Sequence, residues 1–380
     1  MTNEEKFELI TRNLEEVLTE KELKVLIDSG TPLRHYIGFE ISGKPHLGSG
    51  LALMYKIKDF VDAGVDCTIF VADWHTWINK KLDGKFETIS RLGREFWIEA
   101  MKAGYLCVGG NPNDLHFVQG TDLYKENPNF WATMVEISQN TTLNRMLRSI
   151  SIAGRAEGEN VDFAILLYPA MQAADIFTLQ INLAHAGMEQ RKAHVIAIDT
   201  ALQINTNPLK DKSGKQIKPI ALHNHLILGL KKPPVWPVPK ENLREIKIAM
   251  KMSKSNPSSG VFIFDSPDEI REKVNDAFCP EGEVEFNPIL DWVKWLIFYD
   301  SALQGETLQI QRDKKWRGDL EYSSYEDLER DFAEKRLHPQ DLKKAVAEWL
   351  IKKLEPARKY FEDPKRKQAL EEIEKLTTSH

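Results

Sequence analysis

The segment K-M-S-K-S at residues 251–255 places two ammonium groups and two small hydroxyls in one short stretch. Asn256, Pro257 and Gly260 follow it and favour a loop. Lysine ammonium groups are compact charges on flexible stems, which suits the moving negative charge of a polyphosphate. We therefore interpret the segment as a phosphate-binding loop, although a solvated basic turn has the same composition.

A second candidate anion site, H-L-G-S at residues 46–49, lies where a predicted strand meets a predicted helix. Residues 34–41 are β-rich, and residues 51–64 favour a helix that ends at a glycine. Small residues such as Gly48 at a helix start expose backbone N–H groups, and the helix dipole favours an anion there. His46 could donate to phosphate oxygens. Alone, such a tetrapeptide is more often a helix cap and tight turn.

The elements that position these motifs predict an α/β fold. A second apolar run at residues 67–72 ends at Asp73 and completes a βαβ unit, so we expect a Rossmann-type domain with a mostly parallel sheet. Ligands of such sheets bind beyond the carboxyl ends of the strands. Gly38, Glu40 and Asp73 are therefore candidate ligand contacts.

The composition limits the class of protein. The chain has 380 residues, a net charge of -6 and 42% hydrophobic residues, enough for two globular domains and too acidic for indiscriminate nucleic-acid coating. An acidic start and the lack of about 18 consecutive apolar residues predict a cytoplasmic protein without a membrane span. The three cysteines are far apart, so we predict neither a disulfide framework nor a metal site.

The apolar stretch at residues 166–184 carries one charged residue, Asp175. Tyr168 and Pro169 predict the start of a helix, which would place Gln172 and Asp175 on one face. A buried carboxylate needs a partner. A neighbouring backbone group is the ordinary partner, whereas a phenolic ligand that also contacts Tyr36 is the functional alternative.

Together, the H-L-G-S and K-M-S-K-S segments resemble the H-I-G-H and K-M-S-K-S signatures of class I aminoacyl-tRNA synthetases. Ser49 departs from the pattern, since the signature has a histidine there. The resemblance implies amino-acid activation by ATP and Mg²⁺, with catalytic roles for His46, Lys251 and Lys254. It also implies the following ATP contacts: Gly38, Glu40, His46, Gly48, Asp73, Gly187, Lys251, Met252, Ser253, Lys254 and Ser255.

The segments Y-I-G-F-E, Y-P-A-M-Q-A-A-D and G-M-E-Q-R-K-A-H narrow the resemblance to tyrosyl-tRNA synthetases of the archaeal and eukaryotic type. This resemblance implies that Tyr36 and Asp175 contact the hydroxyl of L-tyrosine. It implies that Tyr168, Gln172 and Gln190 hold the amino group and the side-chain surroundings. The implied partners are L-tyrosine, tRNA(Tyr) and a second copy of the chain, in a homodimer formed through residues 110–150.

The same resemblance implies contacts with tRNA at two places. Arg148, Arg191 and Lys192 would face the acceptor end, although solvated surface cations are an equal alternative. His338 and Asp341 would contact the anticodon, although an acidic residue is ordinary in the first turn of a helix. Residues 314–317 mix cations with a tryptophan that could stack on an unpaired base.

The second half of the chain predicts a smaller all-helical domain. Helices are expected over residues 266–279 and 325–335 and from residue 339 onward. We assign residues 1–229 to a catalytic domain with an insertion at about 106–160. Residues 230–265 form a linker and the K-M-S-K-S loop, and residues 266–380 form an anticodon-binding domain.

Three other functions remain compatible with parts of this pattern. A tryptophanyl-tRNA synthetase would share the architecture, because a carboxylate also accepts from an indole N–H. A small-molecule adenylyltransferase would share the histidine turn but has no use for the helical domain. A synthetase-like RNA-binding protein without catalysis would not need the lysines of the loop.

Overall fold

The computed structural model describes residues 1–156, 158–241, 243–252, 257–299, 307–312 and 318–378. Its main sheet has the strand order β1-β6-β5-β2-β3-β4, in which β2 to β6 are parallel and β1 is antiparallel to β6. The strands are β1 (Glu16–Leu18), β2 (Arg34–Phe39), β3 (Asp66–Val71), β4 (Leu115–Gln119), β5 (Leu183–Gly187) and β6 (Ile220–Asn224). The predicted Rossmann-type α/β fold is confirmed.

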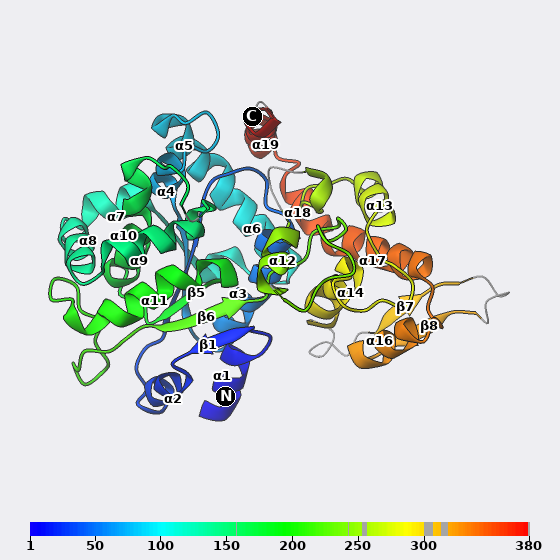
Figure 1. The fold of residues 1–380 in the computed structure, drawn as a ribbon, viewed down its shortest axis with the longest axis horizontal. Helices are drawn as coiled ribbons and strands as arrows, with labels where there is room; N and C mark the ends of the chain where they lie inside the picture. The colour runs from blue at the N-terminus through cyan, green and yellow to red at the C-terminus, as the bar shows by residue number, and fades with distance from the viewer. Residues whose placement is uncertain (157, 242, 253–256, 300–306, 313–317, 379–380) are drawn as a thin grey trace.

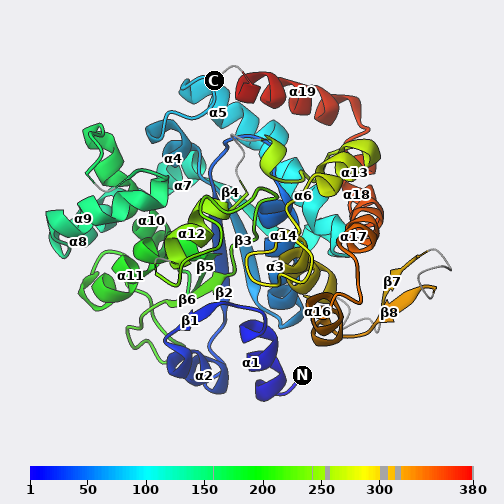
Figure 2. The same ribbon diagram turned by 45° about the vertical axis from the view of Figure 1, so that its right-hand side comes forward.

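Helices cover both faces of the sheet. In Figures 1 and 2, α10 (Phe163–Thr178) and α11 (Arg191–Thr200) lie on one side of the strands, and α3 (Leu53–Asp62) and α6 (Ile98–Cys107) lie on the other. Successive side chains of β2 point to opposite faces of the sheet, so the strand contacts both helix layers. Ile37 packs in the α3 and α6 layer, whereas Tyr36 packs in the α10 layer.

The remaining helices of the first half lie around this framework. They are α1 (Asn3–Thr11), α2 (Glu20–Asp28), α4 (Asp73–Ile78), α5 (Phe86–Leu92), α7 (Gly120–Glu126), α8 (Asn129–Gln139) and α9 (Leu143–Ser149). Every helix within the described ranges is too short or too polar to span a lipid bilayer.

The second half contains the helices α12 (Leu243–Met250), α13 (Pro267–Asn275), α14 (Pro288–Trp292), α16 (Tyr325–Ala333), α17 (Pro339–Lys353), α18 (Glu355–Tyr360) and α19 (Pro364–Thr378). Ser266 and Glu269 form the predicted capping box before α13. The expectation of an all-helical domain is wrong in one detail, because β7 (Leu308–Ile310) pairs with β8 (Leu320–Tyr322). Both segments alternate apolar and polar residues, which is the pattern of a half-buried ladder.

Two predicted boundaries differ from the structure. Strand β4 lies in the expected insertion at 106–160 but pairs with β3 in the main sheet. Helix α12 lies in the segment expected as a linker. The largest apolar cluster also runs from the sheet into the second half, for example from Ile37 through Trp97 to Trp292 and Leu350. The two halves therefore share one core.

Helix α10 starts earlier than predicted. It begins at Phe163, so Pro169 lies inside the helix and not at its first position. A proline in a helix interior costs about 3 kcal/mol because it removes a backbone hydrogen bond. The buried apolar face of α10, which packs against α8 and α11, offsets this cost.

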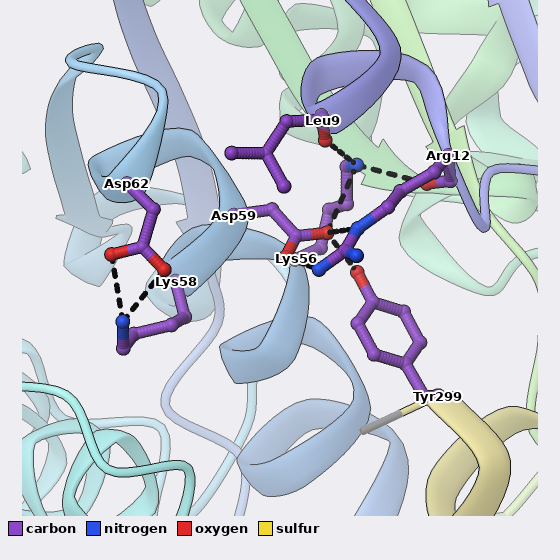
Figure 3. Close-up of polar contacts among 7 residues, drawn as sticks. All are labelled: Leu9, Arg12, Lys56, Lys58, Asp59, Asp62 and Tyr299. Atoms are coloured by element: carbon purple, nitrogen blue, oxygen red, sulfur yellow. Dashed lines mark hydrogen bonds and ion pairs between the residues drawn. The ribbon is translucent and has the colours of Figure 1, made fainter. Parts of the chain in front are cut away.

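A buried charge cluster joins the N-terminal helix to the second half (Figure 3). Asp59 on α3 accepts hydrogen bonds from Arg12, from Lys56 and from the Tyr299 hydroxyl, the last at 2.6 Å. Lys56 also donates to the carbonyls of Leu9 and Arg12 at 2.9 Å. Burial lowers the pKa of Lys56 to about 8, although Asp59 opposes this shift.

Candidate active site

A cavity of about 350 Å³ opens at the carboxyl end of β2 and collects residues from both halves of the chain. This is the position that ligands of open parallel sheets occupy. The cavity is lined by most of the residues that the sequence predicted: Tyr36, Gly38, Glu40, His46, Gly48, Tyr168, Gln172, Asp175, Gly187, Gln190, Lys251 and Met252.

Asp175 closes one end of the cavity and is fully buried. Its Oδ1 accepts a hydrogen bond from the Tyr124 hydroxyl at 2.9 Å. Its Oδ2 has no hydrogen-bond partner among the described residues and lies 3.7 Å from Nε2 of His75. Burial raises the pKa of Asp175 well above its ordinary value, while the bond from Tyr124 lowers it. A ligand that brings a hydrogen-bond donor to Oδ2 would satisfy this carboxylate.

Tyr36 faces the same end of the cavity from β2. Burial, reinforced by Asp175, raises its pKa well above the ordinary value, so the phenol keeps its proton. A Cβ atom at Gly38 would lie 3.1 Å from the Tyr36 hydroxyl oxygen, which is tight. Glycine at position 38 therefore leaves room for the hydroxyl of Tyr36 beside the ligand.

His75 is an uncharged residue that lines the cavity near Asp175. Burial lowers its pKa to about 3, so it carries no charge near neutral pH. Its ring packs edge-on against Tyr168 with centroids 4.6 Å apart. Neither ring nitrogen has a hydrogen-bond partner within the described part of the chain. Because Nε2 of His75 lies 3.7 Å from Oδ2 of Asp175, too far for a hydrogen bond, that oxygen remains available to a ligand donor.

Several hydrogen-bond acceptors line the cavity. The Tyr168 hydroxyl donates to Oε1 of Glu40 at 2.8 Å, and Asn79 donates to the same oxygen at 3.0 Å. Gln190 donates from Nε2 to the Ile152 carbonyl at 3.0 Å, so its amide orientation is fixed. Oε1 of Gln172 is buried and has no partner among the described residues. These oxygens suit an ammonium group of a ligand.

The turn at residues 46–49 orients the imidazole of His46. Its Nδ1 accepts the N–H of Gly48 at 3.0 Å, and the Ser49 N–H lies at 3.4 Å. Since Nδ1 is an acceptor, a neutral His46 carries its proton on Nε2 and can donate from there. A Cβ atom at position 48 would lie 2.9 Å from the His46 ring, so glycine permits this arrangement.

Backbone bonds connect this turn to the second motif. The Leu47 N–H donates to the Val261 carbonyl at 3.0 Å, and the Ile263 N–H donates to the Pro45 carbonyl at 3.1 Å. Five residues separate the K-M-S-K-S segment from residues 261–263. The two motifs, which are about 200 residues apart in sequence, therefore share one wall of the cavity.

Lys251 and Met252 begin the K-M-S-K-S segment and line the cavity. Lys251 is exposed and pairs with Leu228 in a short antiparallel bridge. Met252 is buried, and a Cβ atom at Gly260 would lie 2.7 Å from its sulfur. Met252 therefore anchors the segment in the core. Ser253, Lys254 and Ser255 lie outside the described residues.

Asp73, predicted as an ATP contact, is not brought into the cavity. It is fully buried, and its carboxylate accepts bonds from the Trp74 N–H, from Gln119 and from Thr121. Asp73 is the first residue of α4. Its side chain turns toward α7, whereas the side chain of His75 faces the cavity. Among the described residues, no cluster of His, Cys, Asp or Glu forms a metal site.

Sequence reasoning missed His75 and Tyr124. His75 lies two residues past the strand-end aspartate, and Tyr124 follows the carboxyl end of β4 by five residues. The rule that ligands bind beyond strand ends points to both positions. Because the sequence predicts an insertion at about residues 106–160, Tyr124 is not among the residues expected near the site.

Comparisons with known proteins agree with this geometry. A family model for class I tRNA synthetases (W and Y) matches residues 28–355. The chain belongs to this family. A tyrosine–tRNA ligase from Thermococcus gammatolerans is 51% identical over 364 residues, covering 95% of this chain and 96% of the relative. A tyrosine–tRNA ligase from Pyrococcus furiosus is 50% identical with the same coverage.

Solved structures of the family give the same result. A tyrosyl-tRNA synthetase from Pyrococcus horikoshii complexed with L-tyrosine has a TM-score of 0.93 and 48% identity, covering 100% of both chains. A tyrosyl-tRNA synthetase from Aeropyrum pernix has a TM-score of 0.80 and 39% identity, covering 98% of this chain and 99% of that one. The predicted resemblance to tyrosyl-tRNA synthetases of the archaeal and eukaryotic type is confirmed.

In this class I synthetase the three cations predicted for the acceptor end lie together. Lys192 on α11 donates to the Arg148 carbonyl on α9 at 2.5 Å. Arg191 is half-buried and donates from Nε to Glu16 at 2.8 Å. Although burial opposes it, Arg191 lowers the pKa of Glu16. Arg148 and Lys192 are exposed, whereas Arg191 also fixes the start of α11 to β1.

His338 and Asp341 lie at the start of α17, on the opposite side of the sheet from α9 and α11 (Figure 1). His338 is exposed, and its Nδ1 accepts the Gln340 N–H at 3.2 Å as the helix cap. Asp341 is partly exposed in the first turn. The basic and aromatic residues at 314–317 lie outside the described residues.

Proposed function

We infer from the relatives and the cavity that the chain is a tyrosine–tRNA ligase, and we propose a two-step reaction with residues in named roles. A carboxylate oxygen of tyrosine attacks the α-phosphorus of ATP, and the bond to pyrophosphate breaks. A ribose hydroxyl of the tRNA 3′-terminal adenosine then attacks the carbonyl of the adenylate and releases AMP. Both steps need positioning and charge stabilisation and no enzyme nucleophile.

The unpartnered Oδ2 of buried Asp175 beside Tyr36 carries this proposal. A tyrosine phenol donates to Oδ2 and accepts from Tyr36. An unpaired buried carboxylate rejects a phenylalanine, which lacks the hydroxyl. Tyrosyl-tRNA synthetases are themselves the standard example of such rejection by a site built to bond a substrate hydroxyl. Tyr168, Gln172 and Gln190 surround the ammonium group in this proposal, and the carboxylate of Glu40 lies beside it.

We place the ATP phosphates between the two connected motifs. Nε2 of His46 donates to a phosphate oxygen, and the ammonium groups of Lys251 and Lys254 follow the charge onto the leaving pyrophosphate. Gly38, Gly48 and Gly187 allow the nucleotide to approach the backbone. Mg²⁺ arrives bound to the ATP phosphates as part of the substrate. The packing of Asp73 supports a structural role there instead of the ATP contact.

We also propose the larger assembly. Arg148, Arg191 and Lys192 contact the acceptor end of tRNA(Tyr), while His338 and Asp341 contact its anticodon. The exposed apolar side chains Trp131, Val135 and Leu147 on α8 and α9 support a homodimer through residues 110–150. We propose that the enzyme works in the cytoplasm, where tRNA charging supplies translation.

Tyrosine-dependent exchange of pyrophosphate into ATP tests the first step. We expect exchange with tyrosine and much weaker exchange with tryptophan or phenylalanine at equal concentration. Charging of tRNA(Tyr) then tests the second step. Preferred exchange with tryptophan would support the tryptophanyl alternative, and exchange without charging would support a small-molecule adenylyltransferase.

A further inference from the structure

Tyr124 holds the substrate-reading carboxylate from outside the cavity. Its hydroxyl donates to Oδ1 of Asp175 at 2.9 Å, but its ring is 5% exposed and does not line the cavity. Burial, with Asp175 as the next cause, raises the pKa of Tyr124 well above its ordinary value, so the phenol remains a donor. With this donor fixed on Oδ1, Oδ2 is the carboxylate oxygen that has no hydrogen-bond partner among the described residues.

The position of Tyr124 is fixed from two directions. Its ring stacks on Phe130 with centroids 3.8 Å apart. Helix α7, which carries it, begins where Asp73 accepts the Thr121 N–H at 3.1 Å and the Thr121 hydroxyl. Asp73 therefore holds the helix start, and one turn later Tyr124 reaches Asp175. This contact gives the strand-end aspartate a role without any contact to ATP.

The other titratable groups around Asp175 do not replace this donor. Tyr36 faces it from β2 and is needed for the ligand. Nε2 of His75 lies 3.7 Å from Oδ2, too far for a hydrogen bond, and the ring is neutral. Asp73 is a like charge that raises the pKa of Asp175. The hydrogen bond from Tyr124 opposes the effect of burial on the pKa of Asp175 and stabilises the ionised carboxylate.

We propose that Tyr124 is a positioning residue for tyrosine specificity: it holds Oδ1 of Asp175 and thereby presents Oδ2 as the acceptor for a phenolic hydroxyl. The inference rests on the proposed role of Asp175 in tyrosine recognition. Without the bond from Tyr124, the carboxyl rotates and protonates more readily, and a neutral carboxyl loses less than a carboxylate when the substrate brings no donor. The site then distinguishes tyrosine from phenylalanine less well.

Tyr124→Phe in the full-length enzyme tests this, because it removes the hydroxyl and keeps the stacked ring. We expect the KM for tyrosine in pyrophosphate exchange to rise about tenfold, with kcat and the KM for ATP nearly unchanged. The preference for tyrosine over phenylalanine falls by a similar factor. The acidic limb of kcat/KM for tyrosine moves to higher pH, because the lost donor had stabilised the carboxylate.

Two variants make the result decisive. Phe130→Leu removes the stacking partner but keeps the Tyr124 hydroxyl and the Asp73 anchor at the start of α7. It should therefore lower the unfolding temperature and leave the tyrosine preference and the acidic limb of the pH profile in place. Asp175→Asn tests the underlying recognition. If Asp175→Asn impairs tyrosine use but Tyr124→Phe matches the wild type in KM, preference and pH profile, the role of Tyr124 is overturned. If Asp175→Asn has no effect, the proposed recognition itself fails.

Discussion

Two buried aspartates with tyrosine partners differ in how their carboxylate oxygens are paired. Asp59 on α3 accepts bonds from Arg12, Lys56 and the Tyr299 hydroxyl, which satisfy both oxygens (Figure 3). Asp175 on α10 lines the cavity; one of its oxygens accepts from a tyrosine hydroxyl, and the other is buried without a hydrogen-bond partner among the described residues. Both side chains are almost completely buried.

The difference shows how a buried charge can be interpreted. An acid whose oxygens are all paired with cations and donors joins elements of the fold, here α1, α3 and the segment at Tyr299. In the protein without ligand, an acid with one unpaired oxygen beside a cavity lowers the stability of the fold. A ligand that brings a donor satisfies this oxygen. Asp73 belongs with the first kind, since Gln119, Trp74 and Thr121 pair its oxygens.

The largest expected effect belongs to Asp59→Asn. The substitution keeps the shape but leaves the buried Lys56 and the half-buried Arg12 without their counter-charge, so we expect a loss of about 3–5 kcal/mol in the free energy of unfolding. Denaturant unfolding measures it. Exchange activity per folded molecule, with saturating tyrosine, should stay near the wild-type value. A stable variant with impaired tyrosine binding would remove the distinction between the two aspartates.

The matched substitution Asp175→Asn should have the opposite profile. Loss of a hydrogen bond to a charged acceptor raises the KM for tyrosine by about 10- to 150-fold, equivalent to about 1.5–3 kcal/mol. The free energy of unfolding should stay the same or increase, because an unpaired buried carboxylate is removed. Pyrophosphate exchange and denaturant unfolding give both quantities. A strongly destabilised variant with normal KM would show that Asp175 is structural.

The pH dependence of stability tests the buried cluster of Asp59 at Lys56. Its pKa is about 8 in the folded chain and near its ordinary value of 10.5 when unfolded. Between these values the unfolded chain binds more protons, so the contribution of Lys56 to stability rises with pH across this window. The free energy of unfolding of the wild type minus that of Lys56→Met, measured at pH values of about 7.5 and 9.5, should be larger at the higher pH. A constant difference would contradict the shifted pKa.

The smallest effect is expected at Asp62, which neighbours Asp59 on the same helix. It pairs with Lys58 at 2.7 Å, but the two side chains are 46% and 31% exposed. Exposed pairs four residues apart contribute about 0.3–0.5 kcal/mol. Asp62→Asn should therefore lower the free energy of unfolding by no more than this amount, and less in high salt. A loss as large as that of Asp59→Asn would show that burial does not decide the effect.

Local patterns predicted much of the fold, and most of the residues they predicted for the site line the cavity. The β-rich segment at 34–41 and the capping box at Ser266 depend on neighbouring residues, and both are found. The two motifs and the lone acid of an apolar helix pointed to Tyr36, His46, Asp175 and Lys251, which line one cavity. Residue type and spacing carry this information.

Contacts between distant segments could not be predicted in the same way. Tyr124 lies 51 residues before Asp175, and nothing in either segment alone indicates their hydrogen bond. Local preference places Pro169 at a helix start, but packing of α10 against its neighbours outweighs that preference. The choice of His75 over Asp73 at the cavity depends on how α4 turns after β3.

One paired measurement tests the central claim most directly: the KM for tyrosine and the free energy of unfolding of Asp175→Asn and Asp59→Asn, determined side by side. We predict that Asp175→Asn raises KM by at least about tenfold at unchanged stability. Asp59→Asn should lose about 3–5 kcal/mol of stability at unchanged KM. If the two variants exchanged these profiles, or if both lost stability and affinity together, the distinction between a structural and a substrate-reading aspartate would be wrong.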